Sequence, residues 1–148
     1  MLTQETEDYW IWNEDILVFK PEFNKPLNDY INIIQNYDIL IFSNYSDIAI
    51  CIKTNNQYIY EFKKYFLKSN FNQKVNNLPS SLKKLTFNED SKYDKELNCL
   101  PKKLELLQLP FEYKLEIKNV PNGLNKVICS EDYEYINNFK GLKIETYE

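Results

Sequence analysis

A turn-and-strand pattern recurs along this chain and limits what it can fold into. The fullest copy is Leu78–Phe87, in which a Leu-Pro pair precedes an alternation of apolar residues. Related copies follow at Leu100–Leu109 and at Val120–Cys129. Repetition every ~20 to 25 residues is typical of a solenoid, in which each repeat packs against its neighbours. The pattern predicts how the chain is built and does not by itself name a reaction.

Weaker copies of the strand occur earlier in the chain. Asp15–Phe19 and Asp38–Phe42 differ at one position, and such β-branched and aromatic runs predict short buried strands. Between them, Pro26–Gln35 has apolar residues at helical spacing and predicts a short helix. A third copy is less regular, but Glu61–Leu67 aligns with Ser81–Phe87 and predicts another strand. About seven rungs then fit the chain, with strand centres at Phe19, Phe42, Leu67, Phe87, Leu109, Cys129 and Ile144.

A second motif follows most of these strands. It consists of an aromatic residue, often an amide or acid, two variable residues and an aliphatic residue, as in Phe23–Leu27, Phe71–Val75 and Tyr93–Leu97. We expect the aromatic and aliphatic side chains to fill the core on the side opposite the strand. We expect the Asn or Asp to hydrogen-bond backbone at the corner, as these residues do in turns.

The two motifs together resemble the FNIP repeat, a relative of the leucine-rich repeat, and Phe71–Phe87 is the fullest match. The resemblance covers about residues 15–148. It implies a leucine-rich-repeat-like solenoid of parallel β-strands, with turns and short helical segments on the opposite side. It also implies an interaction scaffold of the kind found in amoebal and giant-virus proteins. The chain departs from the family where Asn88, Pro110 and Ser130 replace the usual Gly, and residues 43–66 lack the Leu-Pro turn.

The domain organisation follows from the extent of the repeats. Residues 1–14 stand outside them and include Trp10 and Trp12, which predicts an N-terminal cap over the first rung. The alternative is that these aromatic residues form an exposed anchor for a partner. Residues 15–148 are expected to form a single repeat domain.

Composition argues against several classes of function. The chain has no His, so the commonest general base and the Ser-His and Cys-His pairs are absent. Its net charge of −4 and its lack of Arg argue against a nucleic-acid binder. The scattered cysteines Cys51, Cys99 and Cys129 do not suggest a zinc site or a disulfide framework. We therefore expect no enzyme, no metal and no cofactor.

The sequence also bears on location. No apolar stretch is long enough to span a bilayer, and the N-terminal residues lack the pattern of a signal peptide. We expect a cytoplasmic protein (in the host-cell cytoplasm if it is viral) that has no membrane or nucleic-acid partner.

The strand alternation predicts which side chains face outward. With Leu85 and Phe87 inward, Lys84 and Thr86 point outward, and the same positions in the earlier rungs are mostly apolar. Contiguous exposed apolar patches are uncommon on monomers and often bind partners. The predicted partner-binding residues are Ile16, Val18, Ile39, Ile41, Lys64, Phe66 and Lys84.

The apolar patch could instead be covered within the chain or by a second copy. The segment with Trp10 and Trp12 could fold over it, or a homodimer could bury it. The leading hypothesis is a non-catalytic scaffold that binds a protein partner through the exposed sheet face. The alternatives are a homo-oligomeric self-assembly module and a carboxylate-based hydrolase. For the hydrolase, acidic clusters such as Glu89–Glu96 lack any neighbouring catalytic signal.

Overall fold

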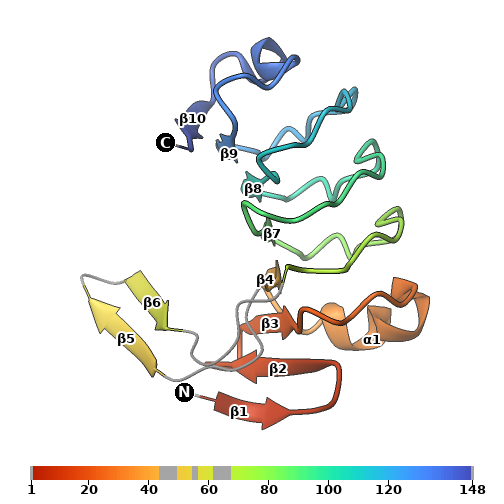
Figure 1. Cartoon of the computed structure of the whole chain (residues 1–148), viewed down its shortest axis with the longest axis vertical. Helices are drawn as coiled ribbons and strands as arrows, with labels where there is room; N and C mark the ends of the chain where they lie inside the picture. Colours follow the sequence, from red (N-terminus) through yellow and green to blue (C-terminus); the bar gives the residue numbers. More distant parts are fainter. Residues whose placement is uncertain (1, 44–49, 55–56, 62–67, 148) are drawn as a thin grey trace.

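An eight-stranded sheet is the main structural element of the described residues (Figure 1). The computed structural model describes residues 2–43, 50–54, 57–61 and 68–147. Neighbouring strands follow the order β1-β2-β3-β4-β7-β8-β9-β10. Their bounds are β1 (Leu2–Glu5), β2 (Tyr9–Trp12), β3 (Ile16–Phe19), β4 (Ile39–Phe42), β7 (Lys84–Phe87), β8 (Leu106–Gln108), β9 (Lys126–Cys129) and β10 (Lys143–Thr146).

From β3 to β10 the strands are parallel and in register, as expected for a leucine-rich-repeat-like solenoid. The inward residue of each rung lies beside that of the next, so that Leu17, Leu40, Leu85, Leu107 and Val127 form one column with no exposed surface. The expected fold class and the inward positions of Leu85 and Phe87 are therefore confirmed.

The first residues form a hairpin against this stack. β2 pairs antiparallel with both β1 and β3. The three-residue turn between Trp12 and Ile16 holds Asn13 (φ 52°) and Glu14 (φ 67°) in the left-handed region, so the chain reverses within a tight hairpin. β1 and β2 therefore extend the sheet beyond β3 as antiparallel strands.

Turns and short helical segments lie on the opposite side of the stack, to the right in Figure 1. The helix predicted over Pro26–Gln35 appears as η1 (Leu27–Tyr30) followed by α1 (Ile31–Ile34), and it buries Leu27 and Ile34. A further 3-10 segment, η2 (Ile136–Phe139), buries Phe139 near β10.

Stacked rings connect the rungs through the core. In the strand column, Phe42 lies 5.7 Å from Phe19 and 5.2 Å from Phe87, measured between ring centroids. In the corner column, Phe71 lies 5.9 Å from Phe23 and 5.7 Å from Tyr93. The rings of Phe42 and Phe71 also stack on each other at 3.9 Å, so the two columns are joined.

The rung predicted with its centre at Leu67 falls on residues that the structure does not describe. In the described sheet, β4 pairs directly with β7. The described residues of this segment instead form an antiparallel hairpin of β5 (Ile50–Thr54) and β6 (Gln57–Glu61), while 62–67 lie outside the described residues. Figure 1 shows the hairpin on the left of the stack, away from the turns.

The segment that carries the hairpin is inserted at one corner of the stack. Before it, the Ser43 N–H donates to the Phe19 carbonyl oxygen at 3.0 Å. After it, the Asn70 N–H donates to the Pro21 carbonyl oxygen at 2.7 Å, and Phe71 enters the corner column. The chain therefore leaves the stack and rejoins it beside the same preceding turn.

In two rungs, the Asn after the corner aromatic accepts a hydrogen bond from the backbone of the next rung. The Asn72 N–H donates to Asn24 Oδ1 at 2.9 Å, and the Asp94 N–H donates to Asn72 Oδ1 at 3.1 Å. We expected a hydrogen bond at the corner, and the structure shows that it joins two rungs. The bond within the corner is made by buried serines, as when Ser91 Oγ accepts from the Tyr93 N–H.

Candidate functional site

The outward face of the sheet is the surface that the sequence predicted for partner binding. Strand pairing places its residues in two columns. One column contains Ile16, Ile39, Lys84, Leu106, Lys126 and Lys143, and the other contains Val18, Ile41, Thr86, Gln108, Ile128 and Glu145.

At the N-terminal end this face is buried. Ile16 and Val18 are 1% and 0% exposed, and they form a second apolar cluster with Trp10 and Trp12 on β2. Because β2 pairs with β3, each Trp lies beside one of these residues on the same face. The expectation that Ile16 and Val18 are exposed is therefore wrong, since the alternation gives the face of a residue but not what packs on that face.

The other predicted residues have different surroundings. Ile39 and Ile41 are half-buried and pack against the Trp cluster, and Lys84 beside them is exposed. Lys64 and Phe66 lie outside the described residues. The structure thus brings Ile39, Ile41 and Lys84 together on adjacent strands.

Toward the C-terminal end the face becomes accessible and carries several lysines. Leu106 is a half-buried outward residue between Lys84 and Lys126, and Ile128 is a half-buried outward residue in the second column. Lys126 Nζ lies 2.7 Å from Glu145 Oε2, and this contact lowers the pKa of the Glu145 carboxyl. Lys84 forms no ion pair with any residue in the described part of the chain.

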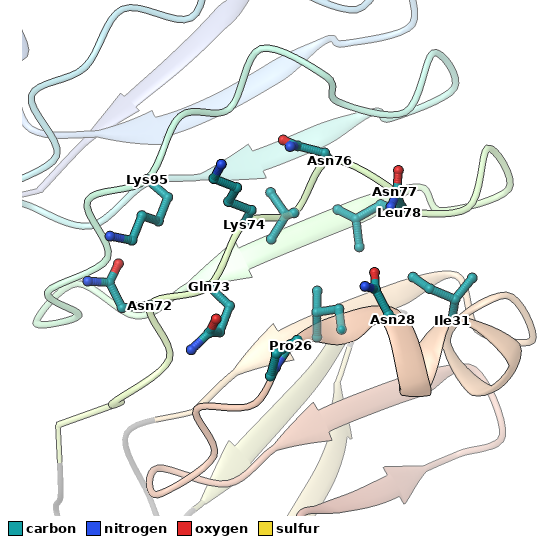
Figure 2. Close-up of a pocket in the computed structure, with 12 residues that line it drawn as sticks. Pro26, Asn28, Ile31, Asn72, Gln73, Lys74, Asn76, Asn77, Leu78 and Lys95 are labelled. Carbon is teal, nitrogen blue, oxygen red and sulfur yellow. The ribbon is translucent and has the colours of Figure 1, made fainter.

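The sequence did not predict a groove on the opposite side of the stack. It has a volume of about 570 Å³ and runs between the η1–α1 turn and residues 72–78 (Figure 2). It is lined by Pro26, Leu27, Asn28, Ile31, Asn72, Gln73, Lys74, Val75, Asn76, Asn77, Leu78 and Lys95. The available signal was the helical spacing of Pro26–Gln35, which makes this turn bulkier than the turns of later rungs.

The groove combines an apolar floor with polar edges. Leu27 and Val75 are buried beneath it, while Asn28 and Asn76 project from its two sides. Among the described residues that line it there is no carboxylate, and the charged ones are Lys74 and Lys95. Its chemistry suits polar or anionic groups better than cations.

The described ionisable groups do not form an acid–base pair in this groove. Hydrogen bonds from Lys92 and Lys126 lower the pKa values of the Glu112 and Glu145 carboxyls, respectively. Partial burial acts to raise the pKa of Asp8, but hydrogen bonds from Tyr30 and Lys25 leave it lowered. A carboxylate-based hydrolase would require a carboxyl group with a raised pKa. The pKa values of these three carboxyl groups are lowered instead.

The described residues contain no group of three or more His, Cys, Asp or Glu placed to hold a metal ion. Within the same residues, no helix is long and apolar enough to cross a membrane. Cys129 fills an inward core position as expected, and burial raises the pKa of its thiol.

Comparison with known proteins bears on the repeats themselves. Residues 71–112 match the FNIP Repeat family. This stretch of the chain carries the FNIP repeat. No curated protein matches the sequence.

The fold of these FNIP repeats also has a solved counterpart. It is similar to the crystal structure of CroV588, described as a novel circular LRR protein, with a TM-score of 0.56 and 22% sequence identity. The match covers 96% of this chain and 22% of that protein, so this chain spans less than a quarter of the length of its counterpart. At this level of identity the likeness concerns the fold alone.

The FNIP motif residues have structural roles in the core and in the turns. Phe71 is a core ring, Asn72 binds the neighbouring rungs, and in the Leu-Pro turn the Leu82 N–H donates to the Pro79 carbonyl oxygen at 3.1 Å. The variable residues between these motif positions are the ones that reach the surface. A specific binding site on this scaffold must therefore be sought among the outward strand positions and the turns.

Proposed function

We propose that this chain is a non-catalytic scaffold that binds a protein partner through the exposed part of its sheet face. This part consists of Ile39 and Ile41 at the edge of the Trp cluster, then Lys84, Leu106 and Lys126 along the adjacent strands. The observation that carries the proposal is the change in this face, from fully buried at β3 to accessible from β7 onward. Solenoids commonly bind partners on the extended surface that their stacked strands create.

The chemistry of this face favours one kind of partner surface. Lys84 and Lys126 lie on either side of Leu106 in one column, and the next residue in that column is Lys143. A partner with an apolar side chain at its centre and carboxylates around it would complement this arrangement. Charge complementarity of this kind contributes to association rate and specificity more than to total affinity.

The buried end of the face would have a supporting role. Ile16 and Val18 are packed beneath or beside the two Trp residues, so they would fix the position of Ile39 and Ile41 without touching the partner. Of the predicted partner-binding residues that the structure describes, Ile39, Ile41 and Lys84 then remain as contact residues. We place this interaction in the cytoplasm, in keeping with the sequence.

The test compares two variants with the same charge change on opposite sides of the stack. The face variant combines Lys84→Glu with Leu106→Asp, and the groove variant combines Lys74→Glu with Asn76→Asp. Partners are captured with the wild-type chain, identified by mass spectrometry, and their direct binding to each variant is measured by calorimetry. Circular dichroism and thermal melting establish that both variants are folded.

Each outcome decides something. A partner that binds the groove variant normally and the face variant at least tenfold more weakly supports the sheet face. A partner that is lost by the groove variant and retained by the face variant would refute the proposed site and move it to the groove. A reproducible small-molecule turnover that depends on one carboxylate would refute the non-catalytic assignment.

A further inference from the structure

Within the described residues, β10 is an edge strand whose inward side chain is partly exposed. Ile144 stands beside Val127 at the inward position of the stack, yet it is 38% exposed, whereas Val127 is fully buried. Among the described residues, β10 has a hydrogen-bonded neighbour on one side only. Its four residues are all exposed. Edge strands of this kind are templates for pairing with another strand.

The hydrogen bonds of β10 show which backbone groups are available. The Lys143 N–H donates to the Asn125 carbonyl oxygen at 3.0 Å, and the Tyr147 N–H donates to the Cys129 carbonyl oxygen at 3.2 Å. In a parallel pair, alternate residues direct their backbone groups toward the neighbour. Ile144 and Thr146 therefore direct their N–H and C=O groups away from β9, toward the open edge.

The charges on β10 then distinguish between the possible pairings with a second copy of itself. In an antiparallel arrangement centred on Ile144, the two Ile144 residues exchange backbone hydrogen bonds. Lys143 of each copy then stands opposite Glu145 of the other, in the closer type of antiparallel pair. A shift in register centred on Lys143 or on Glu145 instead sets like charges directly opposite each other, which is unfavourable.

We propose that β10 is a self-association edge, where two copies of this chain pair antiparallel through Lys143, Ile144 and Glu145. The two Ile144 side chains cover the open end of each other's core. On the outward face, Glu145 of one copy lies between its own Lys126, already 2.7 Å away, and Lys143 of the second copy. The two sheets join into one, and the interface is closed by its two-fold symmetry, so assembly stops at the dimer.

The size of the contact sets the expected affinity. A strand of four residues buries much less than the ~1,200 Å² at the lower limit of stable interfaces. The dimer should therefore be weak, forming at high micromolar concentration, and it should weaken further as salt screens its exposed ion pairs. This interface adjoins the C-terminal end of the face proposed above, where it shares Lys126 and Lys143, whereas Lys84 and Leu106 lie away from it on β7 and β8.

Charge reversal tests this geometry because the interface is self-complementary. Lys143→Glu would set two acids opposite each other twice, and Glu145→Lys would set two lysines opposite each other twice. Each variant alone should dimerise at least tenfold more weakly than the wild type in sedimentation equilibrium. An equal mixture of the two should form a heterodimer, because both mixed pairs again have opposite charges.

Control variants separate this edge from other surfaces. Lys102→Glu makes the same charge change in a turn and should leave the dimer unaffected, as should the face variant with Lys84→Glu and Leu106→Asp. Circular dichroism checks that each reversal variant is folded. The proposal is overturned by a wild-type chain that stays monomeric at millimolar concentration, by single reversals that dimerise normally, or by a mixture that does not recover dimerisation.

Discussion

β3, near the N-terminal end of this sheet, and β9, near its C-terminal end, follow the same alternation but differ in what covers their outward face. In β3, Leu17 faces the main core and Val18 faces the Trp cluster, and neither has exposed surface. In β9, Val127 is equally buried, but Ile128 on the outward face is half-exposed. Identical local patterns thus give a strand buried on both faces near the N-terminus and on one face near the C-terminus. The first region supports the fold, and the second offers a surface.

The largest test of this comparison is a charge placed on the outward face of each region. Val18→Asp would bury an unpaired carboxylate against Trp10 and should lower the free energy of unfolding by about 5 kcal/mol. Ile128→Asp makes a similar change on the accessible face and should cost less than about 1.5 kcal/mol. Urea unfolding measures both, and equal losses would show that the two regions do not differ as described.

A second test concerns the core rings, which are larger toward the N-terminus. Phe42 stacks on Phe19, Phe71 and Phe87, so Phe42→Ala should cost about 4 kcal/mol. At the corresponding position of β9, Cys129→Ala removes one buried sulfur and should cost about 1 kcal/mol. Thermal unfolding followed by circular dichroism should give this order, and the reverse order would contradict the stacking argument.

A third test addresses the polar bonds between rungs. Asn72 bridges two neighbours, so Asn72→Ala should lower stability by about 1 kcal/mol through the unpaired Asp94 N–H. The same corner position in a later rung is Lys114, which is exposed, and Lys114→Ala should have no measurable effect. Chemical denaturation measures the free energy of unfolding of both variants, and the comparison holds when their denaturant dependence is the same. An unchanged free energy for Asn72→Ala would exclude a stabilising role for the bond.

The smallest test compares two neighbouring tyrosines. Tyr113 Oη donates to the Lys95 carbonyl oxygen at 2.8 Å, so Tyr113→Phe should cost about 1 kcal/mol. Tyr93 Oη is buried and has no hydrogen-bond partner within the described part of the chain, so Tyr93→Phe should leave stability unchanged or raise it slightly. Melting temperatures measured side by side separate these outcomes, and a larger loss for Tyr93→Phe would show that its hydroxyl is bonded.

The sequence was a good guide where the pattern is local. The spacing of Leu82, Leu85 and Phe87 repeats in later rungs, and it predicted β7, β8 and β9 with their inward residues. It did not predict the β5–β6 hairpin or the direct pairing of β4 with β7, because resemblance to a strand does not say which neighbour the strand joins. β4 can pair with β7 only if the corner after β4 accommodates an inserted segment. No residue pattern in the sequence predicts that a corner can do this.

The candidate sites were only partly accessible to such reasoning. Alternation identified Ile39, Ile41 and Lys84 as outward residues, since the direction of a side chain follows from its place in the strand. The burial of Ile16 depends on a cluster that includes Trp12 from another strand, and periodicity within one strand contains no such information. The groove and the open edge at Ile144 depend on how whole rungs differ, which also lies beyond a local pattern.

The inserted segment after Ser43 has a further consequence for how the chain folds. The paired residues of β4 and β7 are about twice as far apart in sequence as those of β7 and β8. Doubling a loop adds roughly 0.6 kcal/mol to the entropic cost of closing it, and non-local contacts slow folding. The rungs from β7 to β9 should therefore form the folding nucleus. Mutations in these rungs should give kinetic φ-values of about 1, because their contacts are already formed in the transition state. Docking of β3 and β4 onto β7 should then be the late step that limits the folding rate.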